Sequence, residues 1–253
     1  MIKKSVPHFF TSLNLISGCL AIYFAFLFQF ETAFIFIITG VFFDVWDGFF
    51  ARLLKVESQL GVQMDSMADM VTCGVAPGMI LAQLFVLAGN RAVDVELEWS
   101  FIQTSFEFIP WVLVGFILTL GAAFRLAKFN LDKSQKYTFI GLPTPAMALF
   151  IGSLPILLKQ PDFVFLKPLV ISNPVLTALA LIFVILMNAK FPLFSFKSNQ
   201  TGLIDVVLKI LLILISIFLF WIFSWGAFCI IILVYLILNL IRNSMARIGL
   251  AEE

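Results

Sequence analysis

The sequence predicts an all-α polytopic membrane protein, and three observations support that prediction. Of the 253 residues, 62% are hydrophobic and 12% are charged, whereas a soluble domain is about half apolar and about a quarter charged. The apolar residues form long runs, and about 20 such residues suffice for a helix to cross a bilayer. The polar segments between these runs are too short to form a soluble domain.

Eight transmembrane helices are predicted from these runs. The fifth is the shortest and begins with Pro143 and Pro145. The seventh and eighth are joined by the short turn 223–226, so we expect them to form a hairpin. The predicted spans are, in order, roughly 10–29, 32–54, 64–88, 110–130, 143–158, 170–189, 203–223 and 226–242.

Basic residues predict the orientation, because cytoplasmic loops of membrane proteins are enriched in Lys and Arg. With the N-terminus inside, thirteen of the 16 basic residues lie in inner segments and three, Arg91, Lys159 and Lys167, in outer loops. We therefore expect both termini to be cytoplasmic, and the acidic loop 89–109 to lie outside. The net charge of +1 gives no reason to expect a nucleic-acid partner.

Four aspartates interrupt the apolar runs. Asp44 and Asp47 are three residues apart, and Asp65 and Asp69 are four apart, so each pair shares one helix face. A carboxylate at the centre of a bilayer helix costs roughly 2.5–3.5 kcal/mol, so the pairs should face each other rather than lipid. Carboxylate oxygens suit Mg²⁺ or Mn²⁺. Since the predicted topology puts all four near the cytoplasmic surface, a soluble nucleotide could reach them.

The aspartates belong to a longer pattern: Asp44-x2-Asp47-Gly48-x2-Ala51-Arg52-x8-Gly61-x3-Asp65-x3-Asp69. This pattern resembles the signature of the CDP-alcohol phosphotransferases, integral membrane enzymes that transfer a substituted phosphate from a CDP-linked donor to an alcohol. A buried polar network without chemistry would explain paired carboxylates, but not the glycines, alanine and arginine at fixed offsets. The resemblance covers residues 7 to about 150 and implies a six-helix core. We therefore divide the chain into a core, 1–190, and an additional C-terminal hairpin with a cytoplasmic tail, 191–253.

The resemblance also implies roles for individual residues. Asp44, Asp47 and Asp65 would hold metal, with Asp69 shared between a second metal ion and abstraction of the acceptor's proton. The CDP-lipid would be bound by Thr11, Asn14, Gly48, Ala51, Arg52, Ser58 and Gly61. Plainer explanations stay open: Thr11 or Ser12 could cap a helix, in place of a nucleotide contact by Thr11 and Asn14, and Ser58 could be an ordinary loop residue.

A second segment resembles the phosphatidylserine synthase branch of the same family. The run Arg125-Leu126-Ala127-Lys128-Phe129-Asn130 is followed by Lys136 and by Phe139-Ile140-Gly141-Leu142-Pro143-Thr144-Pro145-Ala146. A basic membrane anchor followed by a proline-rich helix start explains the lysines, but not Asn130 or the GLPTP run. The resemblance implies that L-serine accepts the phosphatidyl group of CDP-diacylglycerol, with Arg125, Asn130 and Lys136 as its binding residues.

Other functions remain open at this point. The acceptor could be glycerol 3-phosphate or inositol phosphate, and the donor an archaeal CDP-ether lipid. A non-enzymatic alternative is a cation transporter, but its carboxylates should lie near mid-membrane. The resemblance further implies a homodimer. A separate feature, Gly74-x3-Gly78 with Pro77 between, predicts close helix packing or a kink.

Overall fold

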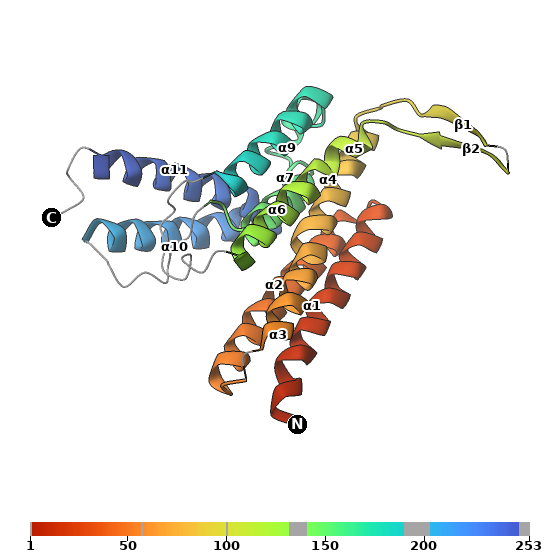
Figure 1. The fold of residues 1–253 in the computed structure, drawn as a ribbon. Coiled ribbons are helices and arrows are strands. Elements are labelled where there is room, and N and C mark those ends of the chain that lie inside the picture. Colours follow the sequence, from red (N-terminus) through yellow and green to blue (C-terminus); the bar gives the residue numbers. More distant parts are fainter. Residues whose placement is uncertain (1, 57, 100, 132–140, 190–202, 248–253) are drawn as a thin grey trace.

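The computed structural model describes residues 2–56, 58–99, 101–131, 141–189 and 203–247. Helices dominate, and one two-stranded sheet interrupts them (Figure 1). The elements are α1 (Ile2–Phe26), α2 (Phe30–Leu53), α3 (Gln59–Asp69), the π-helix η1 (Met70–Val75), α4 (Ala76–Leu87), β1 (Val93–Trp99), β2 (Ile102–Phe108), α5 (Val112–Gly115), α6 (Ile117–Leu131), α7 (Thr144–Leu157), the 3₁₀ turn η3 (Val164–Leu166), α8 (Lys167–Val170), α9 (Asn173–Asn188), α10 (Leu203–Phe223), the 3₁₀ turn η4 (Ser224–Gly226) and α11 (Ala227–Arg247).

The prediction of a helical, multi-pass membrane protein is confirmed. Among the described residues, five helical stretches are long and apolar enough to cross a membrane, or six if η3–α8 and α9, bent by 80°, form one span. One of the five, Val206–Asn243, covers most of α10 and α11, which run side by side in Figure 1. At 14 residues α7 is shorter than a full span, so the count of eight stays a prediction.

The first three predicted spans form the part of the bundle that carries the aspartates. Helix α1 packs along α2 and also against the continuous helix 59–87, which comprises α3, η1 and α4. Helix α1 begins earlier than predicted, because the segment before residue 10 continues the helix through Pro7. Helix α7 packs on α2 and α11, and α6 packs on α9.

The GxxxG segment lies in tight helix contacts, as predicted. A Cβ at Gly78 would lie within 2.3 Å of the Thr119 hydroxyl, and one at Gly74 would lie 3.2 Å from the Ala122 Cβ. The helix widens into the π-helix just before Pro77, whose ring would otherwise clash with the carbonyl four residues earlier. The Thr119 hydroxyl donates to the Gly74 carbonyl at 3.1 Å, so one carbonyl of the widened turn gains a partner.

The GLPTP run forms the entry to α7. Gly141 has a positive φ of 77°, and a Cβ there would lie 2.5 Å from the Met187 carbonyl oxygen, so only glycine fits. The Leu142 amide donates to the Leu186 carbonyl at 2.9 Å, which ties this turn to the end of α9. Pro145 then lies in the first turn of α7, where a missing N–H costs nothing.

Segment 89–109 is more ordered than the simple acidic loop that the sequence predicted. Residues 93–99 and 102–108 form an antiparallel hairpin, paired from Val93 with Phe108 to Trp99 with Ile102. Apolar and polar residues alternate along both strands, a period of two that is typical of strands. An all-α description is therefore correct for the membrane part and omits this hairpin.

The C-terminal helices contact the rest of the bundle through aromatic side chains. Phe228 lies edge-on to Phe34 of α2 at 5.6 Å between ring centroids, and a Cβ on Gly226 would lie 3.0 Å from the Leu157 Cα. The predicted domain boundary at 190/191 and the end of the tail lie outside the described residues, so the two-part division stays a prediction.

Candidate active site

The four aspartates lie on two consecutive helices, α2 and α3, joined by a short turn. Lys55 takes a left-handed conformation in this turn, with φ 54°. Ser58 then caps α3, because its hydroxyl accepts a hydrogen bond from the Gly61 amide at 3.0 Å. The turn brings Asp65 and Asp69 beside Asp44 and Asp47.

Three carboxylates converge closely enough to share a cation. One oxygen each from Asp44, Asp47 and Asp65 lies within 4.8 Å of the others. Asp47 is buried, and Asp65 has a buried oxygen, Oδ1, without a hydrogen-bond partner in the described part of the chain. Such an orphaned oxygen is costly unless a ligand satisfies it, so these residues fit a hard divalent ion. Asp69 lies in the same electrostatic cluster but outside this close group of three.

Helix α1 supplies hydrogen bonds to both pairs. The Thr11 hydroxyl is 2.7 Å from Asp47 Oδ2 and 3.1 Å from the Pro7 carbonyl oxygen. The Asn14 side-chain amide donates to Asp69 Oδ1 at 3.2 Å. Thr11 does not cap a helix, because α1 begins well before it at Ile2. Both side chains are buried partners of carboxylates, and their contact with CDP-lipid stays a prediction.

Thr72, one turn beyond Asp69, fixes the Asn14 side chain. Its hydroxyl lies 2.7 Å from Asn14 Oδ1 and 3.0 Å from the Asn14 backbone oxygen. Since Oδ1 accepts from Thr72, the amide nitrogen is left to face Asp69. Thr72 is fully buried, and a Cβ on Gly18 or Gly40 would come within 2.4 or 2.5 Å of its side chain. Two glycines thus make room for this contact between three helices.

The remaining donor-binding candidates surround the turn between α2 and α3. Arg52 is exposed, and its guanidinium lies over Gly48, where a Cβ would be 3.7 Å from Nη1. Ala51 is half-buried on the same helix. Gly61 lies beside His8 of α1, with 3.5 Å between the position of a Cβ and His8 Cε1.

The two acceptor-binding candidates that the structure describes, Arg125 and Asn130, have different hydrogen-bond partners. The Arg125 guanidinium contacts the Thr144 hydroxyl at 3.4 Å and interacts electrostatically with Asp69, while its buried Nε has no partner among the described residues. Asn130 instead pairs with Ser66 on α3, at 2.9 Å from its Nδ2 to the Ser66 hydroxyl. It lines a cavity of about 630 Å³ that Thr11 and Ser66 also border. Lys136 lies outside the described residues.

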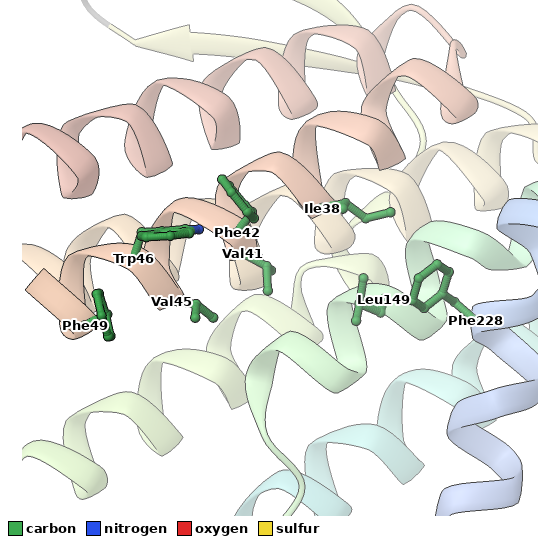
Figure 2. Close-up of a pocket in the computed structure, with 8 residues that line it drawn as sticks. All are labelled: Ile38, Val41, Phe42, Val45, Trp46, Phe49, Leu149 and Phe228. Atoms are coloured by element: carbon green, nitrogen blue, oxygen red, sulfur yellow. The ribbon is translucent and has the colours of Figure 1, made fainter. Parts of the chain in front are cut away.

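An apolar groove runs along one face of α2. Figure 2 shows its lining residues, which come from α2, α7 and α11. Its volume is about 490 Å³, and Val45 and Trp46 lie between the two aspartates of α2 in sequence. The lining residues are Ile38, Val41, Phe42, Val45, Trp46, Phe49, Leu149 and Phe228.

Comparison with known proteins identifies the family. A model of the CDP-alcohol phosphatidyltransferase family matches residues 4–186. The chain belongs to this family. A relative from Bacillus subtilis, named CDP-diacylglycerol–serine O-phosphatidyltransferase, is 33% identical over 193 residues, which are 75% of this chain and 91% of the relative.

Two further relatives match shorter parts. One from Helicobacter pylori with the same name is 31% identical over 147 residues, 57% of this chain and 54% of the relative. An archaetidylserine synthase from Methanothermobacter thermautotrophicus is 30% identical over 151 residues, 59% of this chain and 57% of the relative. This chain therefore spans little more than half the length of these two relatives.

Sequence reasoning missed three features of the site. Thr72 has a usable signal, because a residue three positions after Asp69 shares its helix face. Thr144 was part of the GLPTP run, but its contact with Arg125 depends on how α6 and α7 pack. The groove could have been sought on the face of α2 opposite the aspartates, where apolar residues recur at helical spacing.

Proposed function

We propose that this protein transfers the phosphatidyl group of CDP-diacylglycerol to the hydroxyl of L-serine, which yields phosphatidylserine and CMP. The observation that carries the proposal is the convergence of Asp44, Asp47 and Asp65 in a chain that belongs to this family. The relatives named for serine transfer support serine as the acceptor.

Divalent ions, Mg²⁺ or Mn²⁺ and two in number, are part of the proposal. Asp44, Asp47 and Asp65 would hold the first, and Asp69 would take part in holding the second. When bound, such ions neutralise the donor's diphosphate and stabilise the leaving CMP. Arg52 adds a guanidinium suited to phosphate, and the absence of a side chain at Gly48 leaves the backbone of α2 accessible beside it.

Asp69 and Arg125 would act on the acceptor. Asp69 is half-buried, and Asn14 donates a hydrogen bond to its Oδ1; its other oxygen, Oδ2, would accept the serine hydroxyl proton. Arg125 interacts electrostatically with Asp69, and its unpartnered Nε gives it a donor for the serine carboxylate. Asn130 and Lys136 remain candidates for further contacts with serine.

The donor's acyl chains would lie in the apolar groove on α2. The groove opens toward lipid, since Phe42 and Val45 are 54% and 62% exposed. The groove lies on the face of α2 opposite Asp44 and Asp47, so a CDP-lipid with its diphosphate at the carboxylates would have to pass its acyl chains around α2 to reach it. We also expect a homodimer with both termini and the carboxylates on the cytoplasmic face, as the basic residues predict.

The test is turnover of the purified full-length protein with a panel of acceptors. CDP-diacylglycerol is offered with L-serine, glycerol 3-phosphate or inositol phosphate in the presence of Mg²⁺ or Mn²⁺, and CMP and labelled lipid are measured. We expect lipid product with serine alone. Product with a phosphorylated alcohol and none with serine would contradict the acceptor assignment.

A CDP-ether lipid belongs in the same assay as a second donor. The resemblance to an archaetidylserine synthase is the observation that favours testing it. The comparison of rates for the two donors with serine as acceptor decides which lipid the enzyme uses.

A further inference from the structure

The β1–β2 hairpin has two chemically different faces. The register places Val93, Val95 and Leu97 with Phe108, Phe106 and Thr104 on one face. The opposite face carries polar residues, and the segment 93–108 contains no Lys or Arg. Its four carboxylates are Asp94, Glu96, Glu98 and Glu107. Each strand is thus amphipathic. No helix of the described chain packs against the apolar face of the hairpin (Figure 1).

A two-stranded sheet of this kind needs a partner. An isolated hairpin is marginally stable in water, and packing of its apolar face is what stabilises it. Here Leu97 and Phe106 are 50% and 45% exposed, and Phe101 at the tip is almost fully exposed. Moreover, Asp94 lies directly opposite Glu107, and such a like-charged pair destabilises the ladder. The apolar face should therefore be covered by something outside the described chain.

The base of the hairpin is fixed at the ends of membrane helices. Trp111 stacks on Phe85 near the end of α4, with 5.9 Å between ring centroids. Asn90 and Asn173, at the start of α9, exchange side-chain hydrogen bonds at 2.8 and 2.7 Å. Only residues 88–92 and 109–111 separate the strands from α4 and α5, and five or three residues reach at most about 17 or 11 Å. The hairpin therefore begins within reach of the bilayer surface.

We propose that the β1–β2 hairpin lies on the membrane surface, with the face of Val93, Leu97 and Phe106 among the lipid headgroups and the acidic face in water. In Figure 1 the hairpin extends sideways from the ends of α4 and α5, away from the helices. A lipid surface accepts apolar and aromatic side chains and leaves the four carboxylates hydrated. A basic partner protein would be attracted to the acidic face of the hairpin. It would therefore leave the apolar face uncovered, whereas a lipid surface covers it.

This surface is remote from the carboxylate cluster. Asp69 and Leu87 are separated by 18 residues of one helical stretch, or about 27 Å at about 1.5 Å per residue. The hairpin therefore contacts the leaflet opposite the proposed reaction, and the proposal does not rest on the enzymatic function. Its consequence is an anchor that fixes the depth and tilt of the helix carrying Asp65 and Asp69.

The test uses fluorescent probes at neighbouring positions on the two faces. In the full-length protein with Cys19→Ser, because Cys19 is the exposed cysteine among three, a probe is attached at Leu97→Cys or at its control Glu96→Cys. A second pair, Phe106→Cys and Ser105→Cys, keeps the test valid if one variant does not fold. Each variant is reconstituted into phosphatidylcholine vesicles, and quenching by a lipid-attached nitroxide is compared with quenching by aqueous iodide.

We expect several-fold stronger nitroxide quenching at positions 97 and 106 than at 96 and 105, with the reverse order for iodide. Equal iodide quenching on both faces would mean that the hairpin stands in water, and would overturn the proposal. Shielding of 97 and 106 from both quenchers would also overturn it, because a second copy or another protein would then cover the face.

Discussion

Removal of the Thr72 hydroxyl is expected to slow the reaction without direct contact with either substrate. Thr72→Val keeps the branched shape of the side chain but loses the 2.7 Å hydrogen bond to Asn14 Oδ1 and the 3.0 Å bond to the Asn14 backbone oxygen. The Asn14 amide is then free to rotate, and its 3.2 Å hydrogen bond to Asp69 is no longer enforced.

The magnitude follows from the burial of the contact. Thr72 and Asn14 are both fully buried, and a buried acceptor left without its donor costs about 1–3 kcal/mol. If the loss of Asp69 alignment raises the activation free energy by this amount, the turnover number falls about 5- to 150-fold, since each 1.36 kcal/mol is about tenfold in rate. The Michaelis constant for CDP-lipid should change little, because Thr72 itself is not exposed to substrate.

The assay is CMP release at saturating CDP-diacylglycerol and serine, normalised to folded protein. Thr72→Ser is the matched control, because it keeps the hydroxyl and loses only the methyl group that packs toward Gly40. Such a deletion costs about 0.5–1.5 kcal/mol of stability, but should preserve most of the turnover. A Thr72→Val enzyme within twofold of wild type would refute the reasoning, as would a Thr72→Ser enzyme as slow as Thr72→Val.

Four further predictions concern the carboxylates, the acceptor and the topology. Chelation with excess EDTA should abolish turnover and added Mg²⁺ or Mn²⁺ should restore it; full activity in EDTA would remove the metal from the mechanism. Asp69→Asn should lower single-turnover rates about 10²–10⁴-fold with near-normal CDP-lipid binding, whereas Asp44→Asn should weaken metal and CDP-lipid binding; near-normal chemistry in Asp69→Asn would assign the proton to another group. Arg125→Ala should raise the Michaelis constant for serine far more than that for CDP-lipid, and equal increases would exclude Arg125 from the serine site. A cysteine at position 136 should react with membrane-impermeant reagents from the cytoplasmic side alone, and labelling from the outside would reverse the predicted orientation.

The local sequence pattern was sufficient to predict that the chain is helical and which carboxylates cluster. Long apolar runs require helices in a membrane, because every backbone polar group must be paired internally. The spacing of Asp44 and Asp47, and of Asp65 and Asp69, was enough to put each pair on one face. The family followed from residues at fixed offsets along two neighbouring helices, a match that requires no knowledge of how the helices pack.

Two short-range signals in the sequence point to structure that the surrounding residues obscure. The alternation from Val93 to Trp99 is a strand pattern, but the four acids of segment 89–109 favour a hydrated loop. Pro77 predicts a possible kink, and the structure has a π-helix, Met70–Val75, just before it. The alternation and the proline are both short-range signals. The acidic residues around the first favour a loop, and the proline alone does not distinguish a kink from a π-helix.

Only the tertiary structure decided which side chains meet between helices. The Thr11 contact with Asp47 and the Thr72 contact with Asn14 join residues 36 and 58 positions apart, and no periodicity within one helix predicts them. The Thr72 contact depends on the close approach that Gly18 and Gly40 allow. Likewise, Arg125 and Asn130 come from one run of sequence but contact different helices, α7 and α3, because residues five apart point to different sides of a helix.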